Sequence, residues 1–156
     1  MKKADLLDKL RLVLCDAQKI GFPEDSELFD YLDRATSFYS EQMIAVRDPS
    51  MMKNIPVMGT MSLPDDFVRM AGQHPVAIVG KSMEYYGAVP HEILYFARLP
   101  LPSTFGEDDE LPYTVDQVVM IVNMASVYAL NRNEYDITQD ATLISVWAEA
   151  MKGARS

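Results

Sequence analysis

Apolar residues recur at helical spacing through the first part of the chain. One stripe contains Leu6, Leu10, Val13, Ala17 and Ile20. Because these positions lie three or four residues apart, they share one face of an amphipathic helix. A glycine and a proline follow the stripe in the run "GFP", and both residue types end helices. The first helix is therefore predicted to end near Ile20.

A second apolar stripe begins after the acidic run "EDSE". Asp25 or Ser26 can cap the start of this helix, where acidic side chains also favour the positive end of the helix dipole. The predicted buried face contains Leu28, Leu32, Ala35, Tyr39 and Met43. With a short connection between them, the two helices of residues 1–46 are predicted to form an antiparallel hairpin.

The hydrophobic pattern changes after the second helix. Prolines interrupt residues 47–56, and residues 57–99 then contain the short β-prone runs "VMGTMSL", "VAIVG" and "EILYFARL". Glycine and proline separate these runs, which is typical of a small antiparallel sheet. The following segment to Pro112 is rich in proline and acidic residues, and we expect it to be an exposed loop.

Two further helices are predicted for residues 113–152. Thr114 and Gln117 have the spacing of a capping box at the start of the first one. This helix is apolar nearly all round, with Val118, Val119, Met120, Ile121, Val122, Ala125 and Tyr128. Such a helix is central to a fold or to an oligomer interface. The last helix is predicted to end near Lys152, with an inner face of Leu143, Ile144, Trp147, Ala150 and Met151.

The predicted fold class is therefore α+β, mainly α, in a single domain of residues 1–156. A helical hairpin (1–46) precedes a small antiparallel β insertion (57–99), and two C-terminal helices (113–152) complete the chain. Apolar residues make up 49% and charged residues 24% of the 156 residues, which is ordinary for a globular domain with its own core.

The composition excludes several classes of protein. A single cysteine, Cys15, excludes an internal disulfide framework and a site built from several cysteines, and its place among leucines predicts a buried apolar residue. No apolar run is long enough to cross a membrane. Charged residues interrupt the first helix, which predicts an amphipathic helix and not a signal peptide.

The net charge of −9 bears on possible partners. Binding to a nucleic-acid backbone needs clustered lysine and arginine, and the chain has no such stripe. We therefore expect no specific binding to DNA or RNA. An acidic surface can instead repel DNA or bind a basic protein.

The sequence contains no complete catalytic or ligand-binding motif. The run "VGKS" (Val79–Ser82) has Pro75 where a phosphate-binding loop needs glycine, so it predicts a β-turn. The acidic run Glu107–Glu110 lacks the ligand spacing of a calcium loop and is interpreted as a solvated loop. His74 and His91 have no second ligand at helical spacing and are interpreted as structural or surface residues. We predict no enzyme activity, no catalytic, cofactor or metal residue, and no cofactor.

The run "GTMSLPDDFVRM" contains two adjacent acids, Asp65 and Asp66. A hydrolase needs two carboxylates that face one cleft, whereas adjacent residues of a strand face opposite sides. Pro64 fixes the backbone at a turn, so the aspartates are predicted to solvate this bend before Phe67 returns to the core.

The order of these features resembles the head-to-tail adaptor, or connector, proteins of tailed bacteriophages and prophages. The motifs that carry the resemblance are "LPDDF" (Leu63–Phe67), "RLPLP" (Arg98–Pro102) and the "LPY" entry to a long helix. The similarity covers most of the chain. It departs from the family pattern in the acidic loop Ser103–Glu110 and in the absence of a tyrosine-rich strand after "LPLP".

The resemblance implies a structural virion-assembly protein that binds the portal protein at the capsid vertex. Such proteins self-associate into a ring, commonly a dodecamer, that extends the DNA channel and docks tail proteins. DNA would pass through without specific binding, with no membrane involved. The implied location is the head-tail interface of the virion, and the host cytoplasm during assembly. Two alternatives remain, a small acidic protein-binding or regulatory module and a hydrolase that uses carboxylates.

Overall fold

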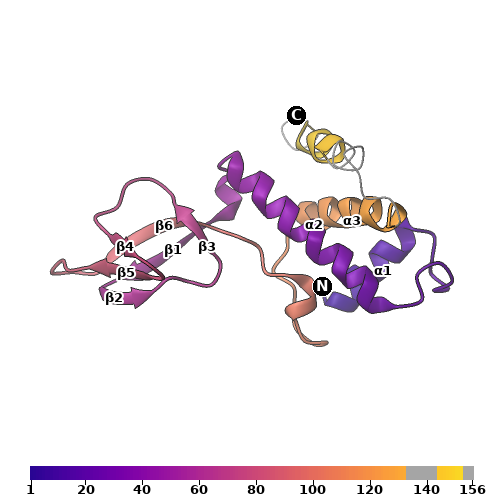
Figure 1. The fold of residues 1–156 in the computed structure, drawn as a ribbon, viewed down its shortest axis with the longest axis horizontal. Helices are drawn as coiled ribbons and strands as arrows, with labels where there is room; N and C mark the ends of the chain where they lie inside the picture. Colours follow the sequence, from indigo (N-terminus) through magenta and orange to yellow (C-terminus); the bar gives the residue numbers. More distant parts are fainter. Residues whose placement is uncertain (133–143, 153–156) are drawn as a thin grey trace. The chain divides into compact units, whose positions relative to one another are not determined.

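The computed structural model describes residues 1–132 and 144–152, and the chain divides into two compact units (Figure 1). Unit 1 comprises residues 1–39 and 100–156, and unit 2 comprises residues 40–99. Helices dominate unit 1, and two small antiparallel sheets form the core of unit 2. The predicted class, α+β and mainly α, is confirmed.

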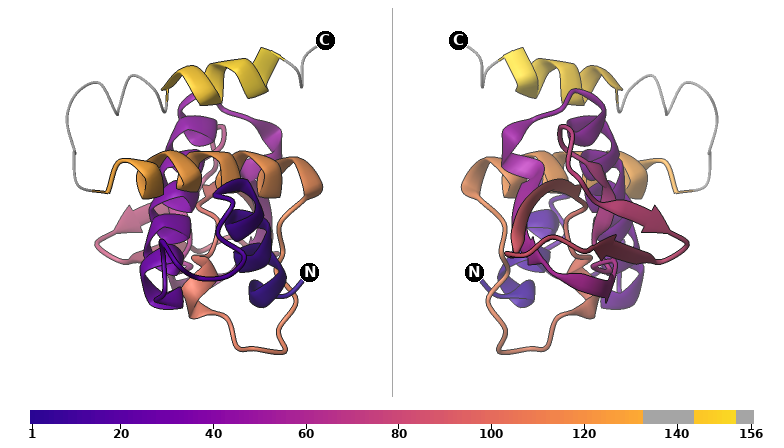
Figure 2. Two further views of the ribbon diagram at one scale, coloured as in Figure 1. Left: turned by 90° about the vertical axis from the view of Figure 1, so that its right-hand side faces the viewer. Right: turned by 90° about the vertical axis from the view of Figure 1, so that its left-hand side faces the viewer.

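The named helices are α1 (Lys3–Val13), α2 (Asp25–Ala45) and α3 (Val115–Leu130), and residues 144–152 are also helical. Within unit 1, α1 packs against α3 (Figure 2). The predicted inner face of α2 is confirmed, since Leu28, Leu32, Ala35, Tyr39 and Met43 are all buried. The last residues of α2, from Ser40 onward, belong to unit 2.

The prediction that the first helix reaches Ile20 is wrong, because α1 ends at Val13. Cys15 and Lys19 both have left-handed backbone, with φ of 55° and 58°, which an α-helix does not accommodate. Ile20 is consequently 79% exposed. Cys15 is exposed as well, so its predicted burial is also wrong.

Helix α3 begins as predicted. The Thr114 hydroxyl accepts a hydrogen bond from the Gln117 N–H, and the Gln117 side chain accepts one from the Thr114 N–H. This reciprocal arrangement satisfies two backbone donors that have no partner inside the helix. The predicted face is buried, comprising Val118, Ile121, Val122, Ala125 and Tyr128.

The last predicted helix is confirmed for residues 144–152. Trp147, Ala150 and Met151 are half-buried, as an inner face requires. Ile144 is exposed, which corrects its assignment to that face, and Leu143 lies outside the described residues.

Unit 2 contains two three-stranded antiparallel sheets, with strand orders β1-β6-β3 and β2-β5-β4. The strands are β1 (Met52–Val57), β2 (Gly59–Ser62), β3 (Phe67–Met70), β4 (Ala77–Val79), β5 (Ser82–Tyr85) and β6 (His91–Ala97). Strand β1 lies mostly in the segment predicted to be irregular. Its proline, Pro56, is tolerated because β1 is an edge strand of its sheet.

The core of unit 2 is formed by residues of both sheets, namely Val57, Met83, Ile93, Tyr95 and Ala97. Strands β4 and β5 are joined by Gly80 and Lys81, since Val79 pairs with Ser82. Gly80 has a φ of 60°, a backbone conformation that glycine adopts at low energy. The predicted β-turn at "VGKS" is therefore confirmed.

Two short 3-10 helices, η1 (Pro49–Met51) and η2 (Pro102–Thr104), interrupt segments without regular structure. The segment before α3 is anchored more firmly than an exposed loop would be, because Pro102 and Leu111 are buried. Residues 106–110, which include the acidic run, are exposed as predicted.

Candidate functional site

An apolar groove lies between α1 and α3, with a volume of about 580 Å³. The described residues that line it are Met1, Lys9, Leu12, Val13, Tyr113, Val115, Val118, Val119, Val122 and Asn123. Both helices belong to unit 1. We name this feature the α1–α3 groove.

Large apolar side chains of the α1–α3 groove are accessible to solvent. Leu12 is 70% and Val13 is 50% exposed on α1, while Val115 is 81% and Val119 is 53% exposed on α3. Single exposed apolar residues are ordinary on protein surfaces, but several that line one concave surface mark an interaction site. The groove is therefore a candidate contact surface.

The polar groups of the groove are few. Lys9 is the one charged side chain among the described lining residues, and it makes no ion pair with another described residue. The Tyr113 hydroxyl donates a hydrogen bond to the Pro100 carbonyl oxygen. Burial raises the pKa of Tyr113, and the charge of Asp33 adds to this shift. The phenol therefore stays neutral, and its hydrogen bond holds Tyr113 in place on one side of the groove.

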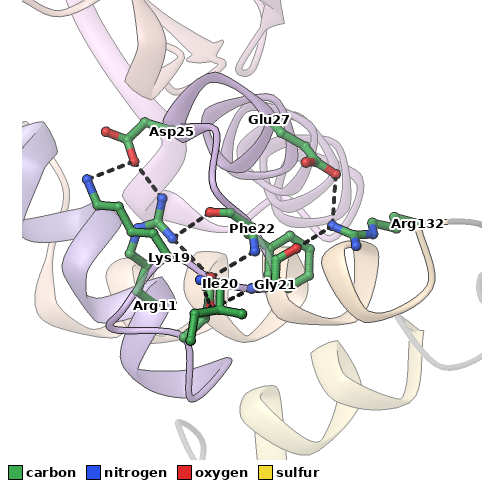
Figure 3. A network of polar contacts seen from close by, with 9 residues as sticks. Arg11, Lys19, Ile20, Gly21, Phe22, Asp25, Glu27 and Arg132 are labelled. Carbon is green, nitrogen blue, oxygen red and sulfur yellow. Dashed lines mark hydrogen bonds and ion pairs between the residues drawn. The ribbon is translucent and has the colours of Figure 1, made fainter.

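A buried arginine fixes the chain where α1 ends (Figure 3). Arg11 is 3% exposed. Its Nη1 donates to Asp16 Oδ2 at 3.1 Å and to the Phe22 carbonyl oxygen at 2.8 Å, and its Nη2 donates to Asp25 Oδ1 at 2.5 Å. One planar guanidinium thus joins α1, the connecting segment 14–24 and the start of α2, which suits its fixed donor geometry.

Asp16 organises the same connecting segment. Its two carboxylate oxygens accept backbone N–H bonds from Ile20, Gly21 and Phe22, each at 2.9 Å. The bond from Gly21 is the largest cause that holds the pKa of Asp16 below its usual range, ahead of those from Phe22 and Ile20 and the charge of Arg11. The carboxylate replaces the helical hydrogen bonds that the sequence pattern predicted for this segment.

Arg132 holds the connecting segment from the end of α3. Its Nη1 donates to the Gly21 carbonyl oxygen at 2.9 Å and lies 3.5 Å from Glu27 Oε1, as Figure 3 shows. Its guanidinium carbon lies 4.4 Å from the centre of the Phe22 ring, within cation–π distance. The segment after α1 is therefore held by Arg11 of α1, by Asp25 of α2 and by Arg132 after α3, while Leu12 and Val13 line the groove.

The exposed acidic run pairs with the first residues of the chain. The amino group of Met1 donates to Glu110, and Lys2 Nζ lies 3.4 Å from Asp108 Oδ1. Lys3 Nζ lies 3.8 Å from Glu107 Oε1. Such exposed pairs contribute little to stability, but they locate this acidic run beside the start of α1.

The adjacent acids Asp65 and Asp66 have different environments. The turn is confirmed, since the Phe67 N–H donates to the Pro64 carbonyl oxygen at 3.0 Å. Asp65 is exposed. Asp66 Oδ2 accepts from Lys53 Nζ at 2.6 Å and Asp66 Oδ1 accepts from the Tyr95 hydroxyl at 3.0 Å. Burial and the Asp66 carboxylate raise the pKa of Tyr95 to about 12. Asp66 therefore binds two strands together and does not form an acid pair with Asp65.

The structure brings together two residues that the sequence pattern left apart. His74 Nδ1 lies 2.9 Å from His91 Nε2, although 17 positions separate them in the chain. No local motif predicts this contact, because it depends on how the segment after β3 returns to β6.

The part of the chain that the structure describes contains no group of three or more His, Cys, Asp or Glu placed to hold a metal ion. In the same residues, no helix has the length and apolar character needed to cross a membrane. No protein-family model matches the chain, and no curated protein matches it in sequence.

Proposed function

We propose that this protein is a structural adaptor of a tailed bacteriophage or prophage, which binds the portal protein and forms a ring that joins head to tail. The observation that carries the proposal is the α1–α3 groove, an open apolar surface on the two helices Lys3–Val13 and Val115–Leu130. The motifs Leu63–Phe67 and Arg98–Pro102 resemble those of head-to-tail adaptors, and this resemblance indicates the kind of assembly that the groove would serve.

A ring needs an interface between unlike surfaces of neighbouring copies. When one surface of each copy binds a different surface of the next, the assembly closes if the rotation between copies is right. The groove supplies one of the two surfaces. Lys9 lies in it without an ion-pair partner among the described residues, and the chain has a net charge of −9, so an acidic surface of the neighbouring copy is the complementary partner.

The charge of the chain suits a channel for DNA. A passage lined by many copies of an acidic chain repels phosphate groups, so DNA would slide through without sticking. The absence of a basic stripe in the sequence supports the same interpretation.

The alternatives receive less support. A hydrolase needs two carboxylates facing one cleft, but Asp66 is bound to Lys53 and Tyr95 while Asp65 faces solvent. A small acidic binding module would use the same groove for one partner molecule. It therefore differs from an adaptor in stoichiometry.

The proposal is tested by mixing the purified chain with the portal protein encoded in the same genome and measuring the mass of the complex by light scattering. An adaptor gives a complex with one copy of the chain for each portal subunit. Genes for portal, terminase and major capsid protein should lie beside its own gene. A binding module gives a complex with some other protein, and failure to bind portal, together with a metabolic gene neighbourhood, would overturn the proposal.

A further inference from the structure

The two histidines of the chain form a hydrogen-bonded pair within unit 2 that the proposed function does not use. His74 Nδ1 lies 2.9 Å from His91 Nε2, and the rings meet edge to face with their centroids 5.2 Å apart. His74 lies in the segment that follows β3, and His91 is the first residue of β6. The pair therefore fastens this segment to the start of a core strand.

A hydrogen bond between two imidazoles needs one N–H and one lone pair. A neutral imidazole has one of each, whereas an imidazolium has two N–H donors and no acceptor. The bond between His74 and His91 therefore forms when both rings are neutral or when one of them is charged. It cannot form when both are charged, and two positive charges at this distance also repel each other.

The other nitrogen of His74 has a partner in either protonation state. His74 Nε2 lies 3.2 Å from the Leu94 backbone nitrogen and 3.0 Å from the Ala71 carbonyl oxygen. A neutral His74 with its proton on Nδ1 accepts from the Leu94 N–H at Nε2. A charged His74 donates from Nε2 to Ala71 instead. The first added proton thus changes a partner of His74 without breaking the bond to His91.

No carboxylate of a described residue is hydrogen-bonded to the His74 or His91 ring. The Tyr85 ring of β5 lies 5.6 Å from the His91 ring, and β1 places Val57 opposite His91. The nearest acids along these strands, Glu84 and Glu92, neighbour Tyr85 and His91 in sequence and so face the opposite sides of their strands. Neither acid forms a hydrogen bond or ion pair with a ring among the described residues.

We propose that the His74–His91 pair is an acid-sensitive latch of unit 2. The latch holds residues 71–76 against β6 while at most one ring is charged, and it opens when both rings are charged. Free imidazoles gain protons between about pH 8 and pH 5. Because the closed latch cannot hold a charge on both rings, acid favours the open form, and the stability of unit 2 falls as the pH falls.

Amide hydrogen exchange of the full chain tests the latch. The informative amide is that of Ala71, which donates to the Leu94 carbonyl oxygen at 2.8 Å in the segment that the latch holds. After correction for the intrinsic pH dependence, the protection of the Ala71 amide should fall about tenfold or more between about pH 7.5 and pH 5, relative to the core amide of Ile93. Equal protection at both pH values would overturn the proposal.

The variant His91→Gln is the matched control. A glutamine amide reaches the position of the ring nitrogen and can donate or accept at any pH, so protection of Ala71 should no longer depend on pH. A loss of protection as large as in the unchanged chain would contradict the latch. Nitrogen NMR of the unchanged chain gives a second test, because a scalar coupling between His74 Nδ1 and His91 Nε2 should be present at about pH 7.5 and absent at about pH 5. A coupling that persists would also overturn the proposal.

Discussion

At the scale of single residues, the guanidinium of Arg11 has the largest expected effect on stability. It is buried and donates to Asp16, Phe22 and Asp25. Removing one partner of a buried charge network leaves the remaining charges without compensation. We expect Arg11→Met to lower the free energy of unfolding by about 3 kcal/mol, measured by urea denaturation. Lys9→Met, an exposed change on the same helix, should alter it by less than about 0.5 kcal/mol, and equal effects would contradict this account.

Asp16 gives the same region a dependence on pH. Its pKa in the folded chain lies below its usual range, chiefly because of the Gly21 N–H. A carboxylate of this kind stabilises the fold above the usual aspartate value of about 4, and the stabilisation is lost as the pH falls below that value. We expect Asp16→Asn to flatten the acid dependence of unfolding, measured as urea midpoints at decreasing pH. Asp8→Asn, on the exposed side of α1, should leave the dependence unchanged, and a similar flattening there would refute the assignment.

Replacing each of the adjacent acids of the "LPDDF" run should have different effects on the free energy of unfolding. Asp66→Ala removes the bonds to Lys53 and Tyr95, and we expect a loss of about 1 kcal/mol, allowing for its partial exposure. Asp65→Ala should change the free energy of unfolding by less than about 0.5 kcal/mol. Equal losses measured by chemical denaturation would mean that Asp66 does not have the special role assigned to it.

At the scale of elements, a capping box stabilises the start of α3. The Thr114 hydroxyl accepts from the Gln117 N–H at 3.2 Å. We expect Thr114→Ala to lower the free energy of unfolding by about 1 kcal/mol, as measured by thermal or urea denaturation. Thr114→Ser keeps the hydroxyl and should retain most of the stability, so a loss as large as that of alanine would contradict the capping role.

Elements were predictable where their causes are local. The capping box at Thr114 and the buried stripe of α2 follow from spacing of a few residues, and both are confirmed. The end of α1 was not predictable from periodicity, because the Asp16 carboxylate takes over the backbone donors of the next turn. Strand β1 was not predictable from the sequence pattern either, because Pro56 is a poor strand residue except at a sheet edge.

The candidate contacts were predictable only in part. An apolar surface all round the α3 helix indicated a role in packing or in an interface, and Val115 and Val119 are indeed exposed in the α1–α3 groove. Which residues of α1 complete the groove depends on tertiary packing. The His74–His91 contact likewise depends on a long return of the chain, which no spacing rule encodes.

At the scale of the whole molecule, the groove should control association. We expect Val119→Asp to weaken binding to neighbouring copies or to portal by about tenfold or more, because a carboxylate buried without a partner opposes contact. Val and Asp have similar helix propensities, so the fold should persist. Val89→Asp introduces the same charge at another exposed valine, in unit 2. Light scattering of the complexes should show weaker association for Val119→Asp alone. Equally weak association of Val89→Asp would show that the groove does not control binding.

Electron microscopy of the chain bound to its cognate portal is the decisive experiment. We expect a closed ring attached to the portal, with the α1–α3 groove of each copy covered by an acidic surface of its neighbour. A portal without added density would contradict the proposed function. A ring in which Leu12 and Val119 remain exposed to solvent would contradict the role of the groove.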